Sequence, residues 1–169
     1  EGGGYVRRGP CPPEPPEVLV TERAPQDDQG RVVLSVTAKR GDSVHWEVGS
    51  TPPTAASAKV ENGELATDEM RVTFIAVDST GQVPTGNHFT WENRLRVKSE
   101  TPYRDGTFRL RLKAVPERGS KLRYTFDGSD PKLGGGAYDG ETPVPEGTRV
   151  ILAVAENSGI YSRVERIDL

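Results

Sequence analysis

Five consecutive residues, Asp127 to Pro131, have the side-chain types of a small cation site. They read Asp-Gly-Ser-Asp-Pro, so three oxygen-bearing side chains lie close together, and Asp127 and Ser129 alternate as ligands do in calcium loops. The EF-hand spacing is incomplete, because Tyr138 stands at the twelfth position, where a glutamate is required. A tight turn needs the same residues, since Asp bonds nearby backbone and Pro ends a strand. We therefore predict a turn and no metal.

Acidic, hydroxyl and imidazole side chains form no catalytic pattern in this sequence. Four carboxylates fall within residues 61–69, but a glycosidase needs two acids that face each other across a cleft, so we expect a solvated loop. No serine lies in a Gly-x-Ser-x-Gly elbow. His45 and His88 are far apart, and the single cysteine, Cys11, stands among prolines without an activating setting. We predict that the chain is not an enzyme and uses no cofactor.

Four aromatic residues are candidates for contact with a partner or a ligand: Phe89, Trp91, Tyr138 and Tyr161. Phe89 and Trp91 fall in a segment that we expect to form an elongated hairpin. There they could anchor a partner protein or stack on a sugar ring. The alternative is that Trp91 folds back over the end of its own domain or into the boundary between two domains.

A basic stripe is expected from Arg109, Arg111 and Lys113, which alternate along one strand, and from Arg123 on a neighbouring strand. The stripe could meet a phosphate, an acidic partner or an acidic loop of the parent protein. The alternative is a solvated sheet face that discourages aggregation.

The composition favours thin β-domains with many turns. The 169 residues include 19 glycines and 14 prolines, and valine outnumbers leucine. This argues against a helical bundle, a coiled coil and a collagen-like chain, and no apolar run of 18 residues exists that could span a membrane. The isoelectric point near 5.5 argues against a dedicated nucleic-acid binder.

Short β-branched segments bounded by Gly, Pro, Asp or Asn mark the strands that must position these residues. Four occur in the first half of the chain, at 18–21, 31–38, 44–48 and 71–77.

The alternation of apolar and polar residues in these segments predicts which side chains point inward. Leu34, Trp46 and Val48 are expected to face a core, and His45 to face outward.

The sequence repeats itself at an offset of 78 residues, without a gap from Val18 to Gly81. Ten of the 64 aligned positions are identical, and the inward apolar positions also match. The matched inward pairs include Trp46 with Tyr124, Val48 with Phe126, Phe74 with Leu152, and Ala76 with Val154. Because chance rarely preserves the in-out phase through several strands, we predict one β-unit used twice.

The repeat divides the chain into a Pro- and Gly-rich arm or linker at 1–16 and two units at 17–98 and 99–169. If residues 94–97 match 166–169, the first copy carries six extra residues before its end. The two units follow each other with hardly any linker, so we expect a restrained relative orientation. The basic stripe belongs to the second copy alone, because the equivalent positions in the first are Arg31, Val33, Ser35 and His45.

The second copy resembles the C-terminal β-sandwich module of chitobiases and hexosaminidases, also described as a fibronectin-III-associated module. The resemblance covers about residues 107–169 and rests on a strand with an aromatic pair, an Asp-Gly-Ser-x-Pro turn, a loop with Gly and Tyr, and a Gly-x-x-Ser close. The matching residues are Tyr124, Phe126, Asp127, Gly128, Ser129, Asp130, Pro131, Tyr138, Gly140, Val150, Ala153, Gly159 and Ser162. The first copy departs from the signature, since residues 49–53 read Gly-Ser-Thr-Pro-Pro.

The resemblance implies two tandem immunoglobulin-like β-sandwiches with an accessory, non-catalytic role. Similar tandem units also end large P-loop ATPases of bacterial defence islands, although no GxxxxGK(S/T) motif occurs in this sequence. We therefore expect an interaction or spacer region of a larger bacterial protein. Its partners would be the rest of the parent chain or another protein, not nucleic acid or a membrane.

A different reading is a carbohydrate-associated accessory module of a glycan-active enzyme, since many carriers of the module are secreted glycan enzymes. With one cysteine the chain can form no internal disulfide, which favours a cytoplasmic location for the first reading. The glycan reading implies an extracellular one.

Overall fold

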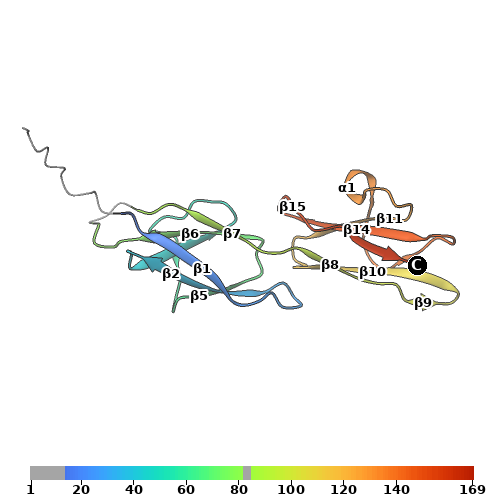
Figure 1. The fold of residues 1–169 in the computed structure, drawn as a ribbon, viewed down its shortest axis with the longest axis horizontal. Helices are drawn as coiled ribbons and strands as arrows, with labels where there is room; N and C mark the ends of the chain where they lie inside the picture. Colours follow the sequence, from blue (N-terminus) through green and yellow to red (C-terminus); the bar gives the residue numbers. More distant parts are fainter. Residues whose placement is uncertain (1–13, 82–84) are drawn as a thin grey trace, which may run out of the picture.

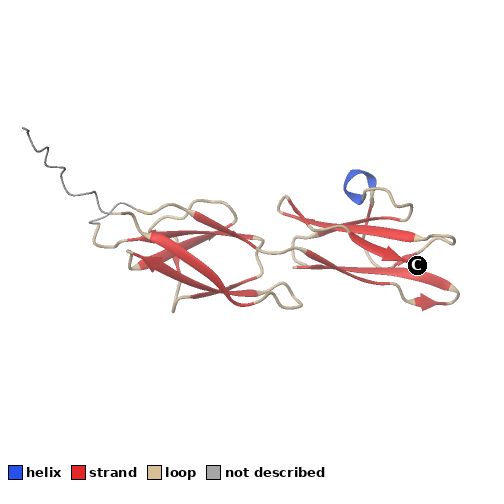
Figure 2. Cartoon of the chain, in the orientation of Figure 1, coloured by secondary structure: helices blue, strands red, loops and turns tan. Residues whose placement is uncertain are grey.

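The computed structural model describes residues 14–81 and 85–169 as an all-β chain with one short helix (Figure 1, Figure 2). The first group of strands comprises β1 (Glu17–Ala24), β2 (Val32–Lys39), β3 (Ser43–Val48), β4 (Ala58–Lys59), β5 (Glu64–Thr67), β6 (Arg71–Val77) and β7 (Phe89–Glu92). The second group comprises β8 (Arg96–Glu100), β9 (Tyr103–Arg104), β10 (Thr107–Val115), β11 (Lys121–Thr125), α1 (Pro131–Gly134), β12 (Gly136–Ala137), β13 (Thr142–Pro143), β14 (Val150–Asn157), β15 (Ile160–Tyr161) and β16 (Glu165–Asp168). No helix in the described residues is long and apolar enough to cross a membrane.

The first group of strands forms two antiparallel sheets that face each other. One sheet has the order β1-β2-β5 and the other β4-β3-β6-β7. Their inner faces share one core of buried apolar side chains, among them Leu34 from β2 and Phe74 from β6. This is a β-sandwich, and the four strands expected from the sequence are confirmed as β1, β2, β3 and β6.

The second group repeats this arrangement with shorter peripheral strands. One sheet has the order β13-β10-β8, with β9 also on β10, and the other has the order β12-β11-β14-β15, with β16 also on β14. Their shared core includes Leu110 and Leu112 from β10 and Ile151 and Ala153 from β14. Figure 1 shows strands β1 to β7 gathered at one end of the molecule and β8 to β16 at the other.

The gapless register of the repeat is wrong in β14. In the first sandwich Trp46 lies opposite Phe74, but in the second Tyr124 lies opposite Ala153 and not Leu152. The core side chains of β14 are accordingly Ile151 and Ala153. One more residue therefore separates β14 from β11 than separates β6 from β3, and a one-residue shift reverses which side chains face the core.

The expected excess of six residues in the first copy is also wrong. Val72 of β6 pairs with Trp91 of β7, and the equivalent Ile151 of β14 pairs with Ile167 of β16. The stretch of chain between the two paired residues is therefore only three residues longer in the first copy. Residues 94–97 do not correspond to the C-terminal strand β16. They instead form the connection to β8 and the start of β8, which pairs with β10.

Two predicted orientations in β3 need correction. Val48 is 47% exposed, because it lies at the last residue of the strand. His45 belongs to the outward set but is buried, since its ring bonds to the Ser57 carbonyl at 2.9 Å and to Ser43 Oγ at 3.2 Å. The segment that contains Ser57 therefore covers the outer face of β3.

The two sandwiches meet in a packed boundary, here called the seam. Met70, Leu95, Ala114 and Ala155 form a buried apolar cluster that draws on both groups of strands. Leu95 lies in the connection between β7 and β8, so the connection itself is part of the packing. The strand β8 crosses residue 98, where the sequence places the boundary between the two units.

Polar contacts surround the apolar cluster of the seam. The guanidinium of Arg118 donates to Asp68 at 2.7 Å and to Glu69 at 2.5 Å. The buried Asn93 amide donates to the Gly30 carbonyl at 2.9 Å. The Arg118 bonds join the second sandwich to the first, so the seam is held by both packing and directional contacts. The Asn93 bond lies within the first sandwich, beside the seam.

The predicted Pro-rich arm, with Cys11, lies outside the described residues up to residue 13. The described end of that segment packs on the first sandwich. Pro16 is fully buried, and Arg40 forms an ion pair with Glu14 at 3.0 Å and bonds the Pro15 carbonyl at 3.3 Å.

Candidate functional site

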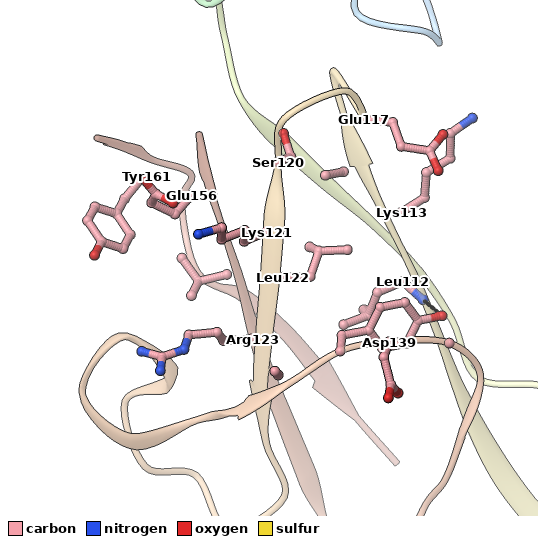
Figure 3. A pocket seen from close by; sticks show the side chains of 15 residues that line it. Leu112, Lys113, Glu117, Ser120, Lys121, Leu122, Arg123, Asp139, Glu156 and Tyr161 are labelled. Carbon is pink, nitrogen blue, oxygen red and sulfur yellow. Dashed lines mark hydrogen bonds between the residues drawn. The ribbon is translucent and has the colours of Figure 1, made fainter. Parts of the chain in front are cut away.

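The second sandwich has a groove of about 800 Å³ that runs around strand β11, here called the β11 groove (Figure 3). Side chains from β10, β11, β12, β14 and β15 line it, together with the turn after β10. Its lining residues are Leu112, Lys113, Ala114, Glu117, Ser120, Lys121, Leu122, Arg123, Ala137, Tyr138, Asp139, Gly140, Val154, Glu156 and Tyr161. Aromatic, basic, acidic and apolar groups are thus all within reach of one ligand.

Two of the four predicted aromatic contacts, Tyr138 and Tyr161, meet in this groove. Tyr138 is half-buried against the core, and its hydroxyl accepts a hydrogen bond of 3.1 Å from the Leu112 backbone N–H. Tyr161 is 51% exposed, and Lys132 Nζ lies 5.2 Å from the centroid of its ring. Tyr138 is therefore fixed as part of the wall, while Tyr161 offers an open ring.

The charged lining residues lie on two sides of β11. Figure 3 shows Lys121 and Arg123 extending to the side of Tyr161, and Leu122 pointing toward Leu112. Arg123 lies opposite the buried Val154 on β14. The side of the groove next to Tyr161 therefore combines two cations and the carboxylate of Glu156 with an aromatic ring over an apolar floor.

The equivalent hollow in the first sandwich is much smaller, about 240 Å³. There β5 pairs with four residues of β2, and the Val36 N–H donates to the Gly63 carbonyl at 2.8 Å. In the second sandwich β13 pairs with β10 only at Arg109 and Leu110. The β11 groove is wide because this covering strand is short, so it is a property of the second sandwich alone.

The other two predicted contacts, Phe89 and Trp91, do not reach the β11 groove, since both lie on β7 of the first sandwich. Phe89 is 44% exposed and lines a separate hollow of about 330 Å³ with His88 and Arg40. Trp91 is only 9% exposed and packs in the core of the first sandwich. The structure thus corrects the suggestion that Trp91 is a surface contact: it folds back into its own domain.

The predicted basic stripe is divided between the two sheets. Arg109, Arg111 and Lys113 do project from one face of β10, because Leu110 and Leu112 between them are buried. Arg123 lies on β11, which belongs to the other sheet of the sandwich. The prediction that all four side chains share one surface is therefore wrong.

Three arginines converge on Glu141, which the sequence analysis did not single out. Arg111 donates to its carboxylate at 2.9 Å, Arg104 forms a close ion pair with it, and Arg109 lies at 3.9 Å. The Arg111 hydrogen bond, together with the charges of the nearby arginines, lowers the pKa of Glu141. The same carboxylate and Glu100 raise the pKa of Arg111.

Glu141 could not be found from sequence spacing, because it lies in a loop some 30 residues from Arg109 and Arg111. The signal that pointed to such an acid is the set of three outward cations at alternate positions on one strand, which favours an opposite charge nearby.

The Asp-Gly-Ser-Asp-Pro segment forms a turn that starts α1. Asp127 Oδ1 accepts bonds from the Ser129 N–H at 3.0 Å and from Ser129 Oγ at 2.5 Å, and this lowers the pKa of Asp127. Asp130 accepts from the Lys132 N–H at 2.9 Å as the N-cap. Within the described residues no group of three or more His, Cys, Asp or Glu side chains is placed to hold a metal.

In comparisons with known proteins, the chain matches no family model and no curated protein.

Proposed function

We propose that this chain is a non-catalytic interaction and spacer region of a larger protein, built from two copies of one immunoglobulin-like module. The seam carries the proposal. A spacer must hold its two ends at a fixed separation, and the connection between β7 and β8 is packed into the boundary through Leu95 instead of being left as an open linker.

The repeat supports the two-module part of the proposal. Strands β3 and β11 begin 78 residues apart, and so do β4 and β12, and β5 and β13. The likeness to the chitobiase-type module remains part of the proposal, with the accessory role that it implies.

Solution scattering on the whole chain tests the spacer role. Arg118→Glu would place a carboxylate against Asp68 and Glu69, and the exposed position of Arg118 leaves both cores intact. We expect the unmodified chain to scatter as one rigid body and Arg118→Glu to give a more flexible profile. Arg149→Glu, which makes the same charge change outside the seam, is the matched control. A flexible profile for the unmodified chain would overturn the proposal.

A carbohydrate-associated accessory role is the second candidate, and the open Tyr161 ring favours it. Aromatic rings stack on sugar faces, and charged groups such as Arg123 and Glu156 can bond sugar hydroxyls beside the ring. A glycan array with the unmodified chain, Tyr161→Ala and Tyr103→Ala tests this role. Tyr103 is the control, because it is 62% exposed and lies outside the β11 groove. Binding that Tyr161→Ala alone abolishes supports the second candidate, and no binding excludes it in favour of the first.

The sequence of the parent protein distinguishes the spacer role from the carbohydrate role. For the spacer role we propose a bacterial, cytoplasmic parent in which a P-loop and a Walker B acid precede this region. For the carbohydrate role we propose a secreted parent with a signal peptide and a catalytic barrel domain.

A further inference from the structure

One outer face of the second sandwich carries an excess of positive charge. Five cationic side chains project from β8, β9 and β10 on the side away from the core, beside the acids Glu100 and Glu141 of the same sandwich and Asp28 of the first sandwich. We call this surface the basic face: Lys98, Arg104, Arg109, Arg111 and Lys113, with Glu100 and Glu141. The whole chain has a net charge of −3, so the charge of this face is opposite to that of the molecule.

Two lysines on the basic face lie directly opposite each other. Lys98 on β8 is the cross-strand partner of Lys113 on β10, and like charges in this position destabilise a sheet. Asp28, from the first sandwich, contacts Lys98 at 2.7 Å, and this contact lowers the pKa of the Asp28 carboxyl. Asp28 also lies close enough to Lys113 to interact with its charge, but Lys113 forms no direct ion pair among the described residues. The ammonium group of Lys113 can therefore still pair with a carboxylate of a partner.

The arginines of the basic face are held in place before any partner binds. Glu141 and Glu100 both accept bonds from Arg111, at 2.9 Å each, from opposite sides of the guanidinium. A guanidinium has five N–H donors, so Arg111 and Arg104 can still donate to a further carboxylate. Arg109 Nε is 3.9 Å from the Glu141 carboxylate, which is too long for a hydrogen bond. Most of the N–H donors of Arg109 are therefore available to a partner.

We propose that the basic face binds an extended acidic segment of another protein, laid along β10. Arg109, Arg111 and Lys113 alternate on one strand, which spaces neighbouring cations about 6.6 Å apart. Acidic residues at alternate positions of an extended peptide have the same spacing, so their carboxylates can meet successive cations. This inference rests on the proposed interaction role and names the surface and the chemistry of the partner.

The face is less suited to a single-stranded nucleic acid. Such strands are bound by basic grooves with aromatic rings on which the bases stack. The exposed aromatic pair of the β9–β10 hairpin, Tyr103 and Phe108, lies on the opposite side of the hairpin, since Phe108 shares the inward phase of Leu110. No aromatic residue projects outward from β8, β9 or β10 on the basic face.

Fluorescence anisotropy with the whole chain tests the inference. The probe is a labelled peptide of alternating Glu and Thr, with a Lys-Thr peptide and an oligothymidylate of matched length as comparisons. We expect binding of the Glu-Thr peptide that weakens by at least about tenfold between about 50 and 200 mM NaCl, and no binding of the Lys-Thr peptide. Tighter binding of the oligothymidylate, or no binding of the Glu-Thr peptide at low salt, would overturn it.

Two double variants locate the surface. Arg109→Glu with Lys113→Glu is expected to weaken peptide binding by about tenfold or more. Arg149→Glu with Arg163→Glu makes the same charge change in the connections that precede β14 and β16 of the other sheet, and is expected to change binding less than about twofold. If the first variant unfolds, Arg109→Gln with Lys113→Gln replaces it, with a smaller loss expected. If both double charge reversals weaken peptide binding equally, the basic face is not the binding surface. A flexible scattering profile for the unmodified chain would refute only the spacer role.

Discussion

Gly30 lies where the two sandwiches touch. Its φ of +88° is in the region that side chains disfavour, and a Cβ added there would approach Pro116 to 2.6 Å. Pro116 follows β10, so one glycine of the first sandwich sets how closely the second can approach. Gly49 has a similar φ of +80° but no atom within 4 Å of an added Cβ. Comparing substitutions at Gly30 and Gly49 therefore separates the cost of backbone strain from the cost of crowding in the seam.

Gly30→Ala is expected to lower the free energy of unfolding by more than Gly49→Ala does. Both substitutions incur the backbone cost of about 1 kcal/mol, and Gly30→Ala adds crowding against Pro116 of about 1 to 3 kcal/mol. Chemical denaturation of both variants measures the difference. Equal losses would show that the seam tolerates an added methyl group at Gly30.

Glu141 makes a pH-dependent contribution to stability. Its folded pKa is lowered by the Arg111 hydrogen bond and the nearby arginines, so the unfolded chain binds the proton more tightly. The stabilisation is therefore complete above the unfolded pKa and is lost as the pH falls through the folded one.

Glu141→Gln is accordingly expected to lower the melting temperature at pH 7, with a difference that shrinks as the pH falls below about 4. Thermal denaturation between pH 7 and pH 3 measures it. Glu146→Gln is the control, because Glu146 is exposed and has no ion pair among the described residues. If Glu141→Gln lowers the melting temperature by the same amount at every pH, the Glu141 carboxylate is not the source of the pH-dependent stability.

Strand β7 passes from the core of the first sandwich to its surface within a few residues. Trp91 and Phe89 are two residues apart and share a face of the strand, yet only Trp91 is buried, because the core ends before Phe89. Sequence spacing places both on one side of β7 and does not indicate where the core stops.

Trp91→Ala is expected to destabilise the chain by about 3 to 5 kcal/mol, since it leaves a cavity in the first core. Phe89→Ala is expected to cost less than about 1 kcal/mol. Urea denaturation of the two variants measures both values. Similar costs for the two variants would refute the burial of Trp91.

The main strands could be predicted from the sequence, because they are short, β-branched segments bounded by turn residues. Period-two alternation reflects burial directly in β2, but not in β3 or β6, whose outward residues His45, Thr73 and Ile75 are also buried. The register of β14 could not be predicted. The run Val150 to Ala155 is apolar at every position, so alternation does not distinguish Ile151 from Leu152 as the inward residue. The absence of a linker predicts a restrained orientation of the two units, but neither the residues of the seam nor Glu141 can be identified from spacing, since their contacts join segments that are distant in the sequence.

At the scale of the whole molecule, the two sandwiches share an architecture but differ in their surfaces. The second has the wide β11 groove and the basic face, while the first presents Arg31, Val33 and Ser35 where the second presents Arg109, Arg111 and Lys113. The first sandwich contributes the charged partners of the seam, Asp68 and Glu69, and the buried Asn93. The proposed ligand-binding surfaces therefore lie on the second sandwich, and both sandwiches contribute to the seam.

A distance measurement across the seam tests the central claim that the two sandwiches keep one relative orientation. Spin labels on Thr37→Cys and Arg166→Cys, with Cys11→Ser to remove the native thiol, place one label on an exposed strand residue of each sandwich. Pulsed electron paramagnetic resonance then gives the distribution of distances between the labels. We predict a single narrow distribution, which Arg118→Glu broadens. A broad distribution in the otherwise unmodified chain would contradict the account.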